Sequence, residues 1–214
     1  MYIATRVINL VQSGLKSYGP SKLKRLLWDT EYSSDKWDFA DNSIGDCVYA
    51  PLEKYAANGS ILDLGCGTGN TANELADAAY QQYVGADISE VCLNKARRRS
   101  KACGREHKNS FVFGDFLTYV PTQQFDVILF RESMYHVPMG KIKATLDRYS
   151  KYLKPNGVFV VRMFTSDSEG KTKPRPAAMF AAIESDFDVV EKSESEKNGT
   201  RAAVWVVRPA SSRV

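Results

Sequence analysis

From about residue 60 onward, short apolar runs alternate with segments whose apolar residues recur at helical spacing, and this alternation limits the possible folds more than any other feature. The runs are apolar almost without interruption, which is typical of strands buried on both faces. Such strands, separated by helices, predict an α/β fold with a doubly wound, mostly parallel sheet. We expect seven strands near residues 61–64, 83–86, 111–113, 127–130, 158–161, 187–190 and 203–207.

The segments between these strands carry helix and turn signals. A helix after the first strand would have one face formed by Ala72, Leu75, Ala76 and Ala79. Further helices are expected over 89–103, 142–153 and 177–183, with a turn at 155–157. The last two strands are joined by a charged loop too short for a crossover helix, so they should pair antiparallel.

Residues 1–59 have a different character, being helical in pattern, basic in places and rich in aromatic residues, including Trp28, Tyr32, Trp37 and Phe39. We expect this part to be an N-terminal helical cap folded onto a core of residues 60–214. The whole chain of 214 residues has the length of one ordinary domain, and it contains no long or simple linker. The cap is therefore predicted to belong to the same domain as the core.

The strongest local signal is the run Leu62-Asp63-Leu64-Gly65-Cys66-Gly67-Thr68-Gly69-Asn70, between the first strand and its helix. Alternating glycines permit positive φ angles and let a ligand approach the backbone. The helix start that follows offers free N–H groups to an anionic group. The spacing is D-x-G-x-G-x-G and not the G-x-G-x-x-G of dinucleotide-binding folds. Asp87 ends the second strand, where a carboxylate can accept both hydroxyls of a ribose.

Residues 63–70 resemble the first motif of class I S-adenosylmethionine (SAM)-dependent methyltransferases, and Asp87 resembles their ribose-binding acid. Residues 113–116 look like the third motif, 125–130 like the fourth-strand motif and 153–157 like the turn before the fifth strand. The resemblance covers roughly residues 59–164, with the motifs in order and at the family's intervals. It implies a Rossmann-like sheet in the order 3-2-1-4-5-7-6, with the last strand antiparallel.

The resemblance also implies that SAM is the cofactor and S-adenosylhomocysteine the product. The glycine loop would line the methionine part and the ribose, Asp115 would bond the adenine amino group, and Arg131 would lie beside the sulfonium. Tyr32 and Trp37 would cover the cofactor, although helix packing would use the same aromatic residues. The implied cofactor-binding residues are Tyr32, Trp37, Asp63, Gly65, Cys66, Gly67, Gly69, Asn70, Asp87, Ile88, Asp115, Phe116 and Arg131.

Methyl transfer from a sulfonium is an in-line displacement, which depends chiefly on aligning the nucleophile, the methyl group and sulfur. A general base is needed only when the nucleophile is protonated. The candidates for that role follow the fourth strand and are Glu132, Tyr135 and His136. The alternative for His136 is a scaffold hydrogen bond shared across the family whatever the substrate.

For the methyl acceptor, we expect O or N of a small molecule, because the cap is the kind of insert that encloses such a substrate. The alternatives are methylation of RNA or protein, and a SAM-binding protein without turnover. A basic run could contact RNA phosphates, but a solvated helix face is the favoured interpretation and nucleic acid is disfavoured as a partner. This run consists of Lys95, Arg97, Arg98, Arg99, Lys101, Arg105 and Lys108.

The remaining composition sets broad bounds. The net charge of +4 decides nothing alone. Four cysteines without a CxxC pair, and two histidines outside zinc-like spacing, predict free thiols and no metal site. No run of 18 apolar residues occurs, and residues 3–15 fit an amphipathic helix better than a signal peptide. We therefore expect a cytoplasmic protein without a membrane span; the oligomeric state is not assigned.

Overall fold

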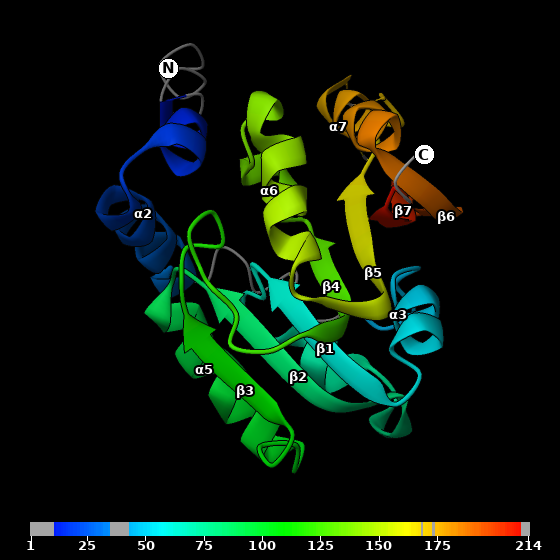
Figure 1. Cartoon of the computed structure of the whole chain (residues 1–214). Coiled ribbons are helices and arrows are strands. Elements are labelled where there is room, and N and C mark those ends of the chain that lie inside the picture. Colours follow the sequence, from blue (N-terminus) through cyan, green and yellow to red (C-terminus); the bar gives the residue numbers. More distant parts are fainter. Residues whose placement is uncertain (1–10, 35–42, 168, 173, 211–214) are drawn as a thin grey trace.

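The computed structural model describes residues 11–34, 43–167, 169–172 and 174–210. Seven strands form one sheet in the order β3-β2-β1-β4-β5-β7-β6, which confirms the predicted order (Figure 1). β7 pairs antiparallel with both β5 and β6, whereas β1 to β5 pair parallel, as expected. The strands are β1 (Gly59–Leu64), β2 (Tyr80–Asp87), β3 (Asn109–Phe113), β4 (Phe125–Arg131), β5 (Leu153–Phe164), β6 (Phe187–Lys197) and β7 (Thr200–Pro209).

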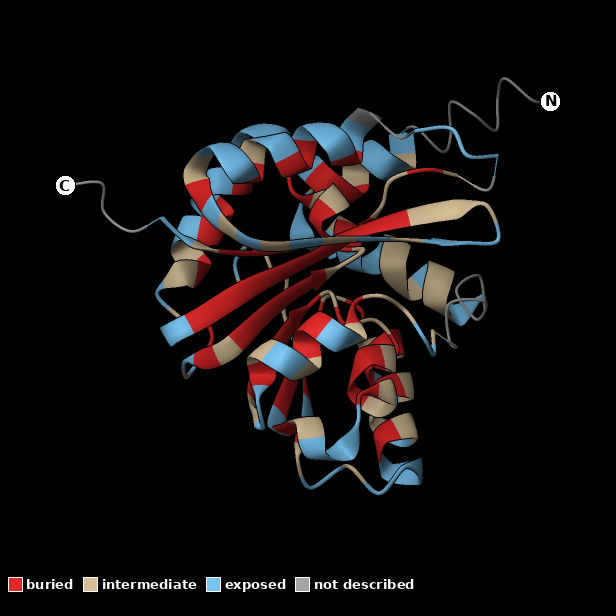
Figure 2. Cartoon of the chain, turned by 90° about the vertical axis from the view of Figure 1, so that its right-hand side faces the viewer, coloured by how far each residue is buried: buried red, intermediate tan, exposed pale blue. Residues whose placement is uncertain are grey.

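Helices cover both faces of the sheet, so its strands are buried between two layers (Figure 2). Ile128 and Phe130 of β4 join the core under α6 and α7, whereas Val127 and Leu129 face the core under α3 and α5. This alternation is the period of two that a strand imposes on its side chains. The helices are α2 (Ser21–Ser33), α3 (Tyr49–Ala56), α4 (Asn70–Glu74), α5 (Glu90–Ala102), α6 (Ile142–Ser150) and α7 (Pro174–Asp186), with short 3₁₀ turns η2 (Asp77–Ala79), η3 (Met134–His136) and η4 (Met139–Lys141).

The helix after the glycine loop is shorter than predicted. α4 ends at Glu74, and the predicted helix face from Ala72 to Ala79 is divided between α4 and the turn η2. Side chains from elsewhere satisfy the carbonyls at this helix end, since Arg105 donates to the oxygens of Ala72 and Leu75. Helix ends need such partners, and a distant residue supplies them here.

The expected turn at residues 155–157 lies within β5 instead of before it. Phe125 of β4 faces Leu153, and Val127 faces Val158, so five steps along β5 match two along β4. Asn156 adopts a φ of 105° in this bulge. The residues Pro155-Asn156-Gly157 therefore form a bulge in β5, where extra residues interrupt the pairing with β4.

The described part of the N-terminal segment lies against the core. Residues 11–18 are helical, and α2 begins after Gly19 and Pro20. α2 lies on the arrowhead side of the sheet, beside α5 (Figure 1). α3 packs instead on a face of the sheet, against β1, β4 and β5. The carboxyl ends of the parallel strands thus meet a helix that precedes the sheet in sequence.

Candidate active site

The glycine loop follows β1 and bends through three positive φ angles, 85° at Gly65, 54° at Gly67 and 75° at Gly69. A Cβ at Gly65 would lie 2.6 Å from Cβ of Ser133, and a Cβ at Gly69 would lie 2.9 Å from Cβ of Ala96. Glycine is therefore required at these two positions by close packing within the chain as well as by φ. Gly67 differs, because a Cβ there would lie 3.0 Å from the hydroxyl of Tyr32, a residue of α2.

Asp87 ends β2 and joins the loop to the start of α5. Its Oδ2 accepts the Gly67 N–H at 3.0 Å, and its Oδ1 accepts the Ser89 N–H at 2.9 Å. Burial raises the pKa of Asp87, and these two backbone donors work against that rise. The carboxylate is thus fixed at the carboxyl edge of the sheet beside the bare backbone of Gly67.

Two buried polar atoms beside the loop have no hydrogen-bond partner within the described chain, Asp63 Oδ1 and Ser133 Oγ. The other carboxylate oxygen of Asp63 accepts the hydroxyl of Tyr83. Burial raises the pKa of Asp63 to about 6, although Tyr83 and the charge of Arg131 lower it. Buried polar atoms are normally paired, so these two atoms fit a ligand that brings a donor such as an ammonium group.

Asp115, the expected adenine partner, is already bonded from two sides. Its Oδ1 accepts the Leu117 N–H at 3.0 Å. Its Oδ2 accepts hydrogen bonds from Lys24 Nζ at 3.2 Å and Ser21 Oγ at 3.0 Å, both from α2. The side chains of Lys24 and Asp115 are each only 8% exposed. The ring of Phe116 packs edge-on against Phe130 with centroids 6.3 Å apart.

α2 contacts the site at three further points. Asp29 accepts the Ser89 hydroxyl at 2.6 Å, next to Asp87 and the half-buried Ile88. Tyr32 lies over Gly67, as described above. Trp28 meets the ring of His136 edge-on, with centroids 5.0 Å apart. Of the two aromatic residues expected to cover the cofactor, Tyr32 thus lies at the loop, while Trp37 is outside the described residues.

Arg131 lies near Asp63 and is bound mainly by N-terminal residues. Its guanidinium donates to Asp46 at 3.0 Å and to Tyr49 and Thr71 at 3.2 Å each. Asp46 also pairs with Arg162 at 2.9 Å. Burial alone would raise the pKa of Asp46, but the charges of Arg131 and Arg162 outweigh it, so the pKa is lowered. The donors of Arg131 are therefore engaged within the protein.

The three candidate acid–base residues cluster after β4 but differ in environment. Glu132, at a φ of 55°, forms an ion pair with Arg162. The hydroxyl of Tyr135 donates to the Phe164 carbonyl at 3.0 Å. Burial lowers the pKa of His136 to about 4, and the nearby positive charges of Lys16, Arg175 and Lys24 add to that effect. His136 is therefore neutral near pH 7.

The end of the loop is bound from α5. Arg99 donates to the side chains of Asn70 and Thr68, the latter at 3.2 Å. Cys66 is buried, and burial raises the pKa of its thiol. A Cβ on Gly85 would lie 2.7 Å from the sulfur of Cys66, so the glycine of β2 makes room for that side chain.

Part of the basic run on and after α5 forms contacts within the protein, while Arg98 and Lys101 are exposed to solvent. Arg97 donates to Glu90 at 2.7 Å and to the Phe111 carbonyl at 2.9 Å. Arg105 donates to carbonyls at the end of α4, and Lys108 pairs with Asp77 at 2.7 Å. With Arg99 on the glycine loop, these contacts account for four of the seven basic residues.

Several residues at the site were not predicted from the sequence, namely Ser21, Lys24, Asp29, Asp46, Arg99 and Arg162. Arg162 had a usable signal, because it is the one charge within the apolar run from Val158 to Phe164. A charge inside a buried strand implies a buried partner. Lys24 and Asp46 had no such signal, since each meets its partner across a large separation in sequence.

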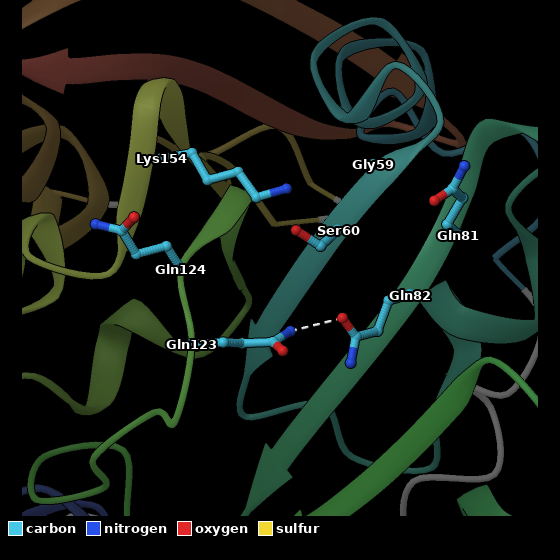
Figure 3. Close-up of a pocket in the computed structure, with 7 residues that line it drawn as sticks. All are labelled: Gly59, Ser60, Gln81, Gln82, Gln123, Gln124 and Lys154. Atoms are coloured by element: carbon cyan, nitrogen blue, oxygen red, sulfur yellow. Dashed lines mark hydrogen bonds between the residues drawn. The ribbon is translucent and has the colours of Figure 1, made fainter.

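A depression with a volume of about 190 Å³ lies at the opposite edge of the sheet, at the start of β1 (Figure 3). Gln123 donates to Gln82 across it at 2.6 Å, and Lys154 pairs with Asp126 beside it. None of the loop residues lines it. Within the described ranges, no cluster of three metal-ligating side chains occurs, and no helix has the length and apolar character needed to cross a membrane.

The chain is similar in sequence to proteins of known family. A family model described as a methyltransferase domain matches residues 41–205. The chain is 30% identical over 126 residues to sterol 24-C-methyltransferase erg6 of Aspergillus fumigatus, a match covering 58% of this chain and 33% of that protein. It is 28% identical over 130 residues to the mRNA cap guanine-N(7) methyltransferase of Schizosaccharomyces pombe, covering 54% and 36%. The chain thus spans about a third of the length of these curated relatives.

The fold agrees with a solved structure, N-methyltransferase NodS from Bradyrhizobium japonicum WM9 in complex with S-adenosylhomocysteine. The TM-score is 0.67 at 18% identity, covering 87% of this chain and 98% of that chain. The sheet order and the glycine loop beside an acid at the end of β2 define a class I SAM-dependent methyltransferase domain. The chain belongs to the methyltransferase-domain family matched over residues 41–205, whose cofactor is SAM.

Proposed function

We propose that the protein is an enzyme that transfers a methyl group from SAM to O or N of a small molecule by in-line displacement. The observation that carries the proposal is a glycine loop in which Asp87 accepts the Gly67 N–H, with one buried oxygen of Asp63 left without a hydrogen-bond partner in the described chain. A nucleoside with an amino-acid tail matches that donor and acceptor set. SAM supplies the electrophilic methyl group when bound.

The roles of the chain's residues follow from their chemistry. Asp87 would accept the ribose hydroxyls, and Asp63 Oδ1 would accept the ammonium of the methionine tail. Asp115 would accept the adenine amino group, with Ile88 and Phe116 against the ring. The loop from Gly65 to Asn70, including Cys66 and Gly69, would line the ligand, and Tyr32 and Trp37 would cover it. Arg131 would lie near the sulfonium end, where its ion pair with Asp46 limits repulsion.

The environments of Glu132, Tyr135 and His136 suit them to orienting the methyl acceptor more than to removing a proton from it. His136 is neutral near pH 7, but its low pKa makes it a weak base. Glu132 is bound to Arg162, and the proton of Tyr135 is donated to a carbonyl. These residues would orient an acceptor whose lone pair is already free, such as an unprotonated amine or an ionised oxygen. Proximity alone can supply about 7 kcal/mol of the barrier reduction.

The alternatives to this proposal are a carbon acceptor, an RNA acceptor and binding of SAM without turnover. The relatives' names include a sterol carbon and an mRNA cap nitrogen as acceptors, so carbon and RNA acceptors belong in any test. The intramolecular contacts of the basic run favour a small molecule over RNA, because Arg97, Arg99 and Arg105 have partners within the chain. A SAM-binding protein without turnover is the third candidate. The cytoplasmic location and the boundary at residue 59 also stay predictions.

The direct test is methyl transfer from SAM carrying a labelled methyl group. Small amines, phenols, carboxylates and a sterol should be offered in parallel with capped and transfer RNA. The proposal expects label in at least one small O or N acceptor. Label found only in RNA or only in the sterol would show that the acceptor is not O or N of a small molecule. Binding of SAM without transfer of label would indicate a SAM-binding protein without turnover.

A further inference from the structure

α2 lies across the crevice where the cofactor is proposed to bind. Ser21 and Lys24 contact Asp115 near one end of the helix, and Asp29 and Tyr32 contact Ser89 and the Gly67 region near the other. From Ser21 to Tyr32 the helix rises about 16 Å. One helix therefore contacts both the predicted adenine end and the loop end of the same crevice.

The carboxylate of Asp115 is already heavily bonded within the protein. Its Oδ2 accepts from Lys24 Nζ and from Ser21 Oγ, both on α2. Its Oδ1 accepts the Leu117 N–H, so one lone pair of Oδ1 is left for an incoming donor. Since the Lys24–Asp115 pair is almost fully buried, solvent does not weaken it as it weakens a surface ion pair. The residue predicted to bind adenine thus also holds α2 against the core through Lys24.

A break in the helical structure precedes α2. Gly19 and Pro20 separate the helical residues 11–18 from α2, and proline at this junction donates no backbone hydrogen bond to the preceding helix. Lys16 crosses the junction by pairing with Glu31 at 2.5 Å and lying 3.7 Å from the ring centroid of Trp28. The side chain of Lys16 therefore ties residues 11–18 to α2.

We propose that the Lys24–Asp115 ion pair is a latch that holds α2 closed over the crevice, and that cofactor entry requires its release. This inference rests on the proposed function, because it takes Asp115 as the adenine partner. The latch lowers the apparent affinity for the cofactor, because part of the binding free energy is spent on moving α2 away from the core. Binding of the adenosyl group and the position of α2 are then coupled.

The test compares Lys24→Met with Lys22→Met, a variant with the same change of charge at an exposed position of the same helix. Calorimetry with S-adenosylhomocysteine is expected to give about fivefold tighter binding for Lys24→Met than for wild type. Lys22→Met should bind as wild type does. Weaker or unchanged binding by Lys24→Met overturns the latch.

Hydrogen exchange of the backbone amides in residues 21–33 provides a second measurement that needs no ligand. In Lys24→Met these amides should exchange faster, while those of β1 and β4 keep the wild-type rate. Equal exchange of α2 in both proteins overturns the latch even if affinity changes. If wild type fails to bind S-adenosylhomocysteine while the α2 amides still exchange faster in Lys24→Met, the proposed function is wrong. The ion pair would then still hold α2 against the core.

Discussion

The imidazole of His136 lies half-buried against Trp28 of α2, and its titration provides a test of how the cap packs on the core. Burial, followed by the charges of Lys16, Arg175 and Lys24, lowers its pKa from 6.5 to about 4, with Glu31 opposing the shift. Below pH 6.5 the unfolded chain therefore binds a proton that the folded chain rejects. Stability from the neutral ring is present above pH 6.5 and is lost as the pH falls toward 4.

The size of the effect follows from the two pKa values. At pH 5 the unfolded His136 is almost fully protonated and the folded one is mostly neutral. Between pH 7 and pH 5 this difference lowers the free energy of unfolding by about 2 kcal/mol. Asp63 has the opposite effect, because its pKa is raised to about 6 and the folded state takes up a proton first. The total pH dependence of wild type is therefore smaller than the His136 contribution.

A comparison with His136→Gln isolates the histidine, because Asp63 is present in both proteins. Urea unfolding at pH 7 and at pH 5 gives the free energy of unfolding of each. Wild type should lose about 2 kcal/mol more than the variant over this interval. Equal losses in the two proteins would show that His136 is accessible and titrates normally, and would refute the packing of α2 against it.

Two further predictions concern contacts that hold the site. Arg99→Met should weaken binding of S-adenosylhomocysteine about fivefold, because Asn70 and Thr68 of the loop lose their donor; the exposed neighbour Arg98→Met should not, and equal affinities in calorimetry would remove this role of Arg99. Asp46→Asn should lower the free energy of unfolding by about 3 kcal/mol, because two buried guanidinium groups lose their common carboxylate. A loss below about 1 kcal/mol by urea unfolding, the size expected of a surface ion pair, would contradict that packing.

The strands could be predicted because each contains a short apolar run, whereas their order in the sheet came from the resemblance to class I methyltransferases. The ends of strands and helices were harder to predict from the sequence. β6 extends to Lys197 although its outer half alternates glutamate, lysine and serine, because the hairpin with β7 pairs that half through backbone bonds. α4 ends at Glu74, where Leu75 leaves the helical conformation, and Arg105, far along the chain, bonds the carbonyls of Ala72 and Leu75. Such ends depend on tertiary partners that no local pattern reports.

The candidate site likewise contains residues that the local sequence predicts and residues that it does not. The loop and Asp87 were predictable, because positive φ angles favour glycine and the aspartate directly follows an apolar run in the sequence. Lys24 was not, since it meets Asp115 across 91 residues and sits in an ordinary helical pattern. Asp46 is separated by 116 residues from Arg162. Residues that act through long-range ion pairs have no spacing rule, so only the folded chain reveals them.

The proposed function depends on Asp87 and the glycine loop holding an adenosyl ligand, which calorimetry of S-adenosylhomocysteine with wild type and Asp87→Ala measures. Asp147→Ala, which removes an exposed carboxylate on α6, is the matched control. Wild type and the control should bind, and Asp87→Ala should lose at least about tenfold in affinity, because two charge-assisted hydrogen bonds to the ribose disappear. Undetectable binding by wild type, or equal affinity in Asp87→Ala, would contradict the proposed function.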